Sequence, residues 1–152
     1  MSLRCLGLAA VLLAVAACGD GGSCGPPSAR VTGVVDGDTV DLATGQRVRY
    51  LLVDTPEVHG TVDCFGPEAQ AFNTDLVQDQ EVTLEYDVEC QDAYGRLLAY
   101  VSVGGRMVNR VLLERGYARL LVIPPNEKYA DEFAEIERQA HAAGAGLWSD
   151  CP

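Results

Sequence analysis

Acidic side chains stand at the points where strand-like segments of this chain end. Asp38 lies in an Asp-Gly turn between β-branched pairs, and Asp54 and Glu57 flank the end of an apolar run at Pro56. Proline ends such a run because it cannot donate to a strand ladder. Carboxylates at the rigid ends of strands can be held in fixed positions, which is what a chemical site requires.

Two arginines accompany these carboxylates. Arg49 begins the apolar run, and Arg96 lies in a second polar turn at residues 92–96. Carboxylate oxygens beside guanidinium forks suit a hard cation held next to a bound phosphate. The alternative is an ordinary set of solvated charges at strand ends.

Several short segments occur in one order along the chain and favour the first interpretation. The ordered set resembles the staphylococcal nuclease (thermonuclease) family over roughly residues 29–148. The segments are residues 35–40, 49–57, 66–69, 94–96 (Tyr-Gly-Arg), 98–101, 107–109 and 146–148 (Gly-Leu-Trp). Each segment alone is common, but their combination in this order is specific.

The resemblance implies one Ca²⁺ ion held by the carboxylates of Asp38 and Asp54 and by the carbonyl oxygen of Thr55. Calcium accepts such mixed oxygen ligands, with water filling the remaining positions. Arg49 and Asp54 are five residues apart, so an ideal strand would point them to opposite faces. Their meeting at one phosphate requires a bend in the backbone, which the resemblance also implies.

The resemblance further implies hydrolysis of DNA and RNA to products with a 3′-phosphate and a 5′-hydroxyl. Arg49 and Arg96 would bind the phosphate and stabilise charge in the transition state. Glu57 would be the general base that orients or deprotonates the attacking water. Tyr94 would border the nucleotide and donate to a phosphate oxygen.

The chain departs from the family pattern where the nucleotide is bound. Ala93 replaces a lysine, and residues 121–125 (Leu-Val-Ile-Pro-Pro) replace a stretch with two tyrosines. The formal net charge of −11 also opposes binding to a polyanion. These features leave two alternatives to a polynucleotide-cleaving enzyme: a non-catalytic binding module of the same fold, and an enzyme for another phosphodiester.

The N-terminus has the layout of a bacterial lipoprotein. Residues 1–17 carry Arg4 and an apolar run that is too short to span a bilayer. Small residues precede Cys18, and a Gly/Pro/Ser-rich stretch follows it. We expect a signal peptide at 1–17, a lipid anchor on Cys18, a tether at 18–28 and an exported, monomeric domain at 29–152. An ordinary cleaved signal peptide is the alternative.

Four cysteines remain in the expected domain and its tether, and an exported domain with an even number predicts disulfides. They allow three pairings, of which we favour Cys24–Cys151 and Cys64–Cys90. A zinc site is disfavoured because the sequence contains no Cys-x-x-Cys pair.

The hydrophobic periodicity predicts an α+β domain. Five strands, one helix among them and two helices after them match a partly open five-stranded β-barrel of OB type with three α-helices, as the family resemblance also implies. We expect strands at 30–35, 39–42, 47–53, 82–88 and 97–103, and helices at 67–79, 108–115 and 129–143.

Overall fold

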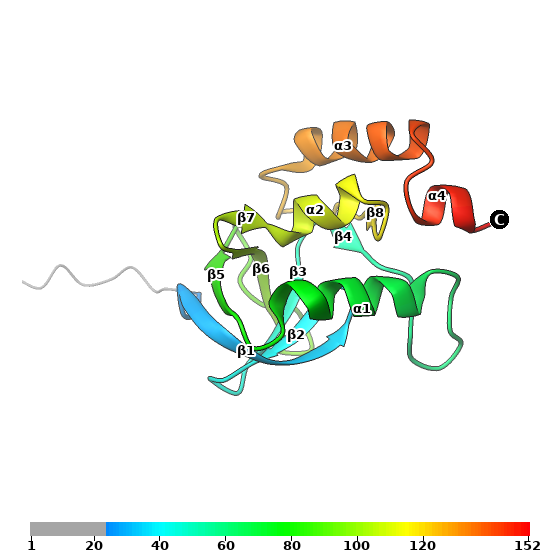
Figure 1. Ribbon diagram of the computed structural model, residues 1–152. Coiled ribbons are helices and arrows are strands. Elements are labelled where there is room, and N and C mark those ends of the chain that lie inside the picture. Colours follow the sequence, from blue (N-terminus) through cyan, green and yellow to red (C-terminus); the bar gives the residue numbers. More distant parts are fainter. Residues whose placement is uncertain (1–23) are drawn as a thin grey trace, which may run out of the picture.

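Five strands close a barrel at the centre of the molecule (Figure 1). The computed structural model describes residues 24–152. The barrel strands are β1 (Ser28–Asp36), β2 (Thr39–Leu42), β3 (Arg47–Tyr50), β5 (Glu81–Glu85) and β6 (Leu97–Val103). Neighbours pair antiparallel in the order β3-β2-β1-β5-β6, and parallel pairing of β3 with β6 closes the barrel. This arrangement confirms the predicted fold.

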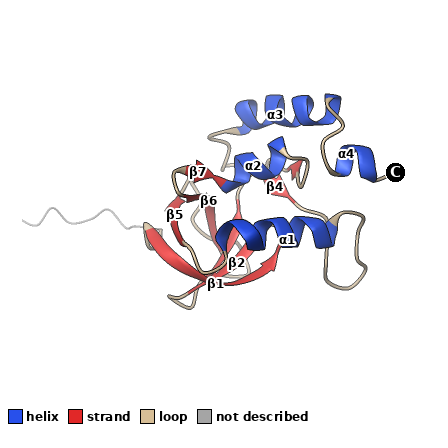
Figure 2. Cartoon of the chain, in the orientation of Figure 1, coloured by secondary structure: helices blue, strands red, loops and turns tan. Residues whose placement is uncertain are grey.

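The helices are α1 (Gly66–Val77), α2 (Val108–Glu114), α3 (Ala130–Ala142) and α4 (Leu147–Asp150). Helix α1 packs against β1, and α3 packs against α2 (Figure 2). The first three were predicted, whereas the short α4 is additional. No helix in the described part of the chain is long and apolar enough to cross a membrane.

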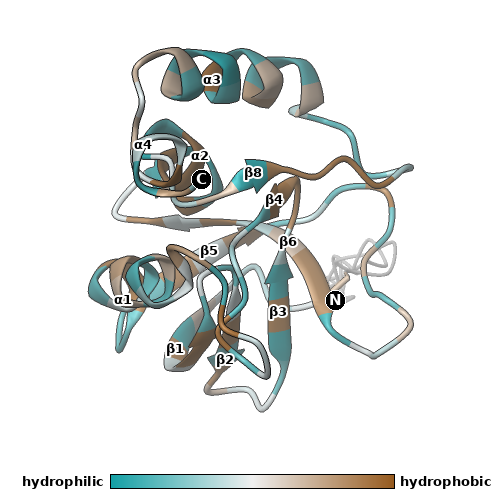
Figure 3. Cartoon of the chain, turned by 90° about the vertical axis from the view of Figure 1, so that its right-hand side faces the viewer, coloured by the Kyte–Doolittle hydropathy of each residue, from teal (hydrophilic) through white to brown (hydrophobic). Residues whose placement is uncertain are grey.

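The barrel core is built by alternation along the strands. In β3, Val48 and Tyr50 are buried while Arg47 is exposed, and Figure 3 shows the resulting bands of hydropathy. In β5, Val82 and Leu84 are buried, Glu81 and Thr83 are exposed, and Glu85 is half-buried. Side chains two apart share one face of a strand, so this pattern turns one face of each strand inward.

The third predicted strand is broken in the structure. Residues 47–53 were expected to form one strand, but β3 ends at Tyr50 and Leu52 adopts a left-handed backbone (φ 61°). The chain then forms β4 (Val53–Asp54), which pairs with β8 (Arg119–Leu120) in a separate small sheet. This is the bend that the family resemblance implied.

A buried side chain satisfies the backbone at this bend. Asn109 is fully buried; its amide nitrogen donates to the carbonyl of Leu51 at 2.8 Å, and its amide oxygen accepts from the N–H of Val101 at 2.8 Å. Buried backbone groups need such partners, because an unpaired one costs about 1–3 kcal/mol. Asn109 therefore joins the bend to strand β6.

The disulfide pairing that we favoured is wrong. The structure joins Cys24 to Cys90 and Cys64 to Cys151, with Cα–Cα distances of 5.1 and 5.8 Å. Residues before β1 run beside β5 and the segment after it, because Pro27 accepts from the Leu84 N–H and Pro26 from the Tyr86 hydroxyl. The N-terminal end of the described chain and the C-terminus lie at opposite ends of the molecule (Figure 1), so a bridge between Cys24 and Cys151 would have to cross the barrel.

Residues 24–28, expected to belong to the tether, lie against the barrel. The carbonyl of Pro26 accepts from the Tyr86 hydroxyl at 2.8 Å, and the carbonyl of Pro27 accepts from the Leu84 N–H at 2.9 Å. The predicted signal peptide, Cys18 and the first part of the tether lie outside the described residues.

Replacing Cys64 and Cys151 together by serine should lower the free energy of unfolding by about 2–4 kcal/mol, because the bridge restricts the unfolded chain. Urea unfolding of the oxidised protein measures this, with the Cys24→Ser, Cys90→Ser pair as a matched comparison. Peptide mapping without reduction should recover both bridges, and recovery of a Cys24–Cys151 peptide would contradict the structure.

Candidate active site

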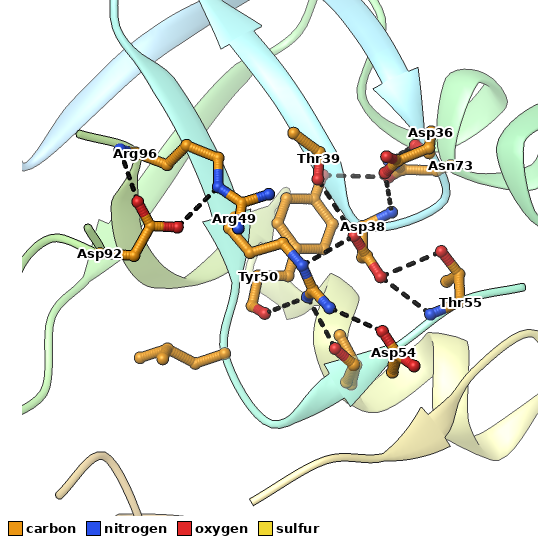
Figure 4. A network of polar contacts seen from close by, with 12 residues as sticks. Asp36, Asp38, Thr39, Arg49, Tyr50, Asp54, Thr55, Asn73, Asp92 and Arg96 are labelled. Atoms are coloured by element: carbon orange, nitrogen blue, oxygen red, sulfur yellow. Dashed lines mark hydrogen bonds and ion pairs between the residues drawn. The ribbon is translucent and has the colours of Figure 1, made fainter. Parts of the chain in front are cut away.

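The guanidinium of Arg49 lies at the centre of a polar network (Figure 4). Its Nη1 donates to the backbone carbonyls of Tyr50 and Val53, both at 2.7 Å. Its Nη2 donates to Asp54 Oδ1 at 2.9 Å, and its Nε lies 3.2 Å from Asp38 Oδ1. One side chain thus holds the bend after β3 and joins the two carboxylates.

Asp38 is buried, and both of its oxygens have partners. Oδ2 accepts from the N–H and the hydroxyl of Thr55 at 2.8 and 3.0 Å, and Oδ1 accepts from the hydroxyl of Thr39 at 3.1 Å. Burial raises the pKa of Asp38 to about 6, since the opposing effect of Arg49 is incomplete and Asp36 adds negative charge nearby. The site therefore contains a carboxyl group whose charge is costly to maintain.

The turn that carries Asp38 is held by helix α1. Asn73 is fully buried; its amide nitrogen donates to the carbonyl of Asp36 at 3.0 Å, and its oxygen accepts from the Tyr50 hydroxyl at 3.0 Å. A Cβ atom at Gly37 would lie 2.7 Å from the side chain of Thr55, so only glycine fits there. Sequence reasoning missed Asn73, although a polar residue within the apolar side of a predicted helix was a usable signal.

Arg96 is held by the turn that precedes it. Its Nε donates to Asp92 Oδ2 at 2.6 Å, and Asp92 Oδ1 accepts from the N–H groups of Tyr94 and Arg96 at 2.9 and 3.0 Å. Burial acts to raise the pKa of Asp92, but the hydrogen bonds from Arg96 and the backbone outweigh it and hold the pKa below its usual value. Asp92 is a positioning residue that the sequence analysis did not assign.

Glu57 begins a short closed loop. The carbonyl of Glu57 accepts from the N–H of Asp63 at 2.9 Å, and its own N–H donates to Asp63 Oδ2 at 3.3 Å. Gly66 packs so closely on this carbonyl that a Cβ atom there would lie 2.4 Å from it. The backbone of Glu57 is therefore held in place, while the residue is exposed to solvent.

The structure brings six of the seven predicted site residues to one small cavity of about 50 Å³. These six residues are Asp38, Arg49, Asp54, Thr55, Glu57 and Arg96. The seventh, Tyr94, is 86% exposed and lines a larger cavity of about 440 Å³ that also borders Arg49 and Arg96. Leu121 and Ile123, which belong to the stretch where the family has two tyrosines, line this larger cavity.

The small cavity offers oxygen donors suited to a hard cation. The side chain of Asp54 is 54% exposed, and the Arg49 guanidinium bridges it to Asp38 as a positive charge between two carboxylates. Within residues 24–152, no group of three or more His, Cys, Asp or Glu side chains is placed to bind a metal ion. A cation here would therefore need the carbonyl of Thr55 and water as well, which calcium accepts.

Comparisons with known proteins agree with this geometry. A family profile described as "Staphylococcal nuclease homologue" matches residues 47–150. The chain is 42% identical over 123 residues to the SPbeta prophage-derived endonuclease YokF of Bacillus subtilis, covering 76% of this chain and 42% of that protein. It is 42% identical to the endonuclease YncB of the same organism, covering 76% and 58%.

A shorter relative is matched over more of its length. The chain is 37% identical over 127 residues to the thermonuclease of Staphylococcus hyicus, covering 80% of this chain and 75% of that protein. By contrast, the chain spans only 42% and 58% of the two Bacillus endonucleases.

Replacing Arg49 by methionine should lower the free energy of unfolding by about 3–5 kcal/mol, because a buried carboxylate and two carbonyls lose their partner. Urea unfolding measures the loss. The matched control is Arg96→Met, which should cost about 1 kcal/mol or less because that ion pair is more exposed. Equal losses in the two variants would contradict a central role for Arg49.

Proposed function

Because the chain belongs to the staphylococcal nuclease family, we propose that it is a nuclease that hydrolyses phosphodiester bonds of DNA and RNA. The observation that carries this proposal is the small cavity. Two arginines, the buried carboxylate of Asp38, the exposed carboxylate of Asp54 and Glu57 all line it. Phosphoryl transfer depends mainly on positioning and on charge stabilisation, and these groups provide both.

Arg96 is the main phosphate-binding group. Its Nε is engaged by Asp92, and within the described residues its Nη groups have no protein acceptor. They are therefore available for a bidentate contact with phosphate oxygens. Arg49 has five N–H groups, of which four contact Asp38, Asp54 and the two carbonyls at the bend. It offers one further donor and a fixed positive charge.

Glu57 is the general base. It lines the small cavity beside Asp54 and Thr55, and the closed loop to Asp63 holds its backbone in place. In this position it orients or deprotonates the attacking water. With departure of the 5′ oxygen, the products carry a 3′-phosphate and a 5′-hydroxyl.

A Ca²⁺ ion would be held by the carboxylates of Asp38 and Asp54 and by the carbonyl oxygen of Thr55. When bound, the ion would polarise the phosphate and offset its negative charge. The donor set supports this assignment, since the three residues line one cavity and offer hard oxygen ligands. Thr55 also fixes Asp38 through two hydrogen bonds and so keeps one carboxylate oriented.

The nucleoside on the leaving side would occupy the larger cavity next to Arg96. Tyr94 offers a ring there, but Leu121 and Ile123 offer aliphatic walls in place of aromatic ones. A stacked base is worth about 1–3 kcal/mol, so we expect weaker substrate binding than a tyrosine-lined pocket would give. The net charge of −11 acts in the same direction.

These two features favour a second candidate, a non-catalytic module of the same fold that binds a protein or a small ligand. Cleavage assays separate the two candidates.

The proposed site of action is outside the cytoplasm. Two disulfides are typical of exported proteins. We place the protein at a membrane, anchored by a lipid on Cys18 after removal of residues 1–17, as the lipobox-like sequence before Cys18 supports.

The purified, oxidised protein should cleave single-stranded DNA, duplex DNA or RNA with Ca²⁺ present, and EDTA should abolish cleavage. Glu57→Gln should lower kcat by about 10²–10⁴-fold, the usual contribution of a general base. Its matched control, Glu81→Gln on the outer face of β5, should leave kcat unchanged. Folded protein that cleaves none of these substrates under any metal or pH would favour the binding module.

Intact-mass analysis of protein extracted from membranes should find an acyl adduct on an N-terminal Cys18. A Cys18→Ala variant should remain unprocessed or be released from the membrane fraction. A mature protein with an unmodified Cys18 would exclude the lipid anchor and leave the ordinary cleaved signal peptide.

A further inference from the structure

A third cavity of about 340 Å³ continues the site on the side away from Tyr94. It shares Asp54, Thr55, Pro56 and Glu57 with the small cavity, and the small cavity shares Arg49 and Arg96 with the large one. The three cavities therefore follow one another, with the small one in the middle. A nucleic-acid strand whose scissile phosphate lies in the small cavity has space for a nucleoside on each side of that phosphate.

The chemistry assigns a direction to this strand. Attacking and leaving oxygens lie roughly in line across the phosphorus. Glu57 lines the small and third cavities but not the large one, whereas Arg96 lines the small and large cavities but not the third. The leaving 5′ oxygen and its nucleoside thus belong to the large cavity, opposite the water that Glu57 orients. The other nucleoside is joined to the phosphorus through the 3′ oxygen, which does not react, and the third cavity is the remaining space beside the phosphate for it.

Arg119 provides a flat surface in this third cavity. Its Cζ lies 4.4 Å from the centre of the Trp148 ring, and pairing of β8 with β4 sets it opposite Asp54. Trp148 is packed edge-to-face against His141, with ring centres 4.7 Å apart. The indole thus supports the Arg119 guanidinium from one side, and nucleobases stack on the planes of arginine guanidinium groups.

The charges of this cavity select a base rather than a second phosphate. Asp54, Glu57 and Asp63 line it against the single cation Arg119, so a further phosphate would meet mainly repulsion. The remaining walls include Leu147 and the Cys64–Cys151 disulfide, which suit apolar ring and sugar surfaces. The volume is also within the range of about 300–1,000 Å³ that small-molecule sites occupy.

We propose that the third cavity binds the nucleoside on the 5′ side of the scissile phosphate, with its base stacked on Arg119. This inference rests on the proposed nuclease function. It makes Arg119 a specificity-determining residue, and it gives the Cys64–Cys151 bridge a second role as a wall of the substrate groove.

The test uses dinucleotides with one phosphodiester bond, in which the base on the 5′ or the 3′ side is replaced by an abasic sugar. Loss of the 5′ base should lower kcat/KM of the wild-type protein at least about fivefold, as expected for stacking worth about 1 kcal/mol. In Arg119→Ala this effect should vanish, while the effect of removing the 3′ base should persist. Arg119→Lys, which keeps the charge but not the plane, should behave like Arg119→Ala.

Arg138→Ala is the matched control, since Arg138 is an exposed, ion-paired arginine on α3. It should retain the full preference for a 5′ base. The inference is overturned if the wild-type protein is indifferent to the 5′ base, or if folded Arg119→Ala and Arg119→Lys discriminate as strongly as wild type.

A binding measurement separates this inference from the proposed function. Trp148 is the only tryptophan of the chain, so its fluorescence reports on the neighbourhood of Arg119. The Glu57→Gln variant is titrated with the intact dinucleotide in the presence of Ca²⁺, and the fluorescence emission of Trp148 should change. The dinucleotide without its 5′ base should change this emission at least fivefold less. An equal response to both would overturn the subsite, whether or not the wild-type protein cleaves.

Discussion

The contacts of the Arg49 guanidinium are the interaction on which the site depends. A strand that continued straight through residue 54 would carry Arg49 and Asp54 on opposite faces. The left-handed backbone at Leu52 turns the chain back, and Arg49 itself pairs the carbonyls of Tyr50 and Val53 at that bend. One side chain thus stabilises the bend and gathers the acidic residues that the bend brings close.

This arrangement carries an energetic cost. Asp38 is buried with its pKa raised, and a buried ion pair recovers its desolvation cost only when every oxygen is well bonded. Two threonines and one arginine meet that condition for Asp38. Asn73 and Asn109, both fully buried, hold the two backbone segments that carry the acids. Because these two buried amides hold the backbone near the acids, the geometry of the site depends on how the core is packed.

The disulfides lie at the two ends of the proposed substrate groove. Cys90 is flanked by Glu89 and Gln91, which line the large cavity, while Cys64 and Cys151 line the third. A cross-link reduces the freedom of the loops that it joins. The acidic, aliphatic groove thus has constrained walls, which reduces the entropy lost when a substrate binds.

The sequence by itself determined the barrel strands and the three longer helices, because alternation, Gly and Pro act locally. The family resemblance, and not local periodicity, indicated that the acids and arginines share one site. The sequence also predicted that the four cysteines of the domain form disulfides. It did not predict which cysteines pair, since pairing depends on which loops share one end of the barrel. Only the tertiary structure decided that the 47–53 segment breaks at Leu52, that Asn73 and Asp92 hold the site, and that Arg119 lies on Trp148. Asn73 and Arg119 contact residues far along the chain, and only packing in three dimensions brings such residues together, whereas Asp92 and Arg96 lie four residues apart in one turn.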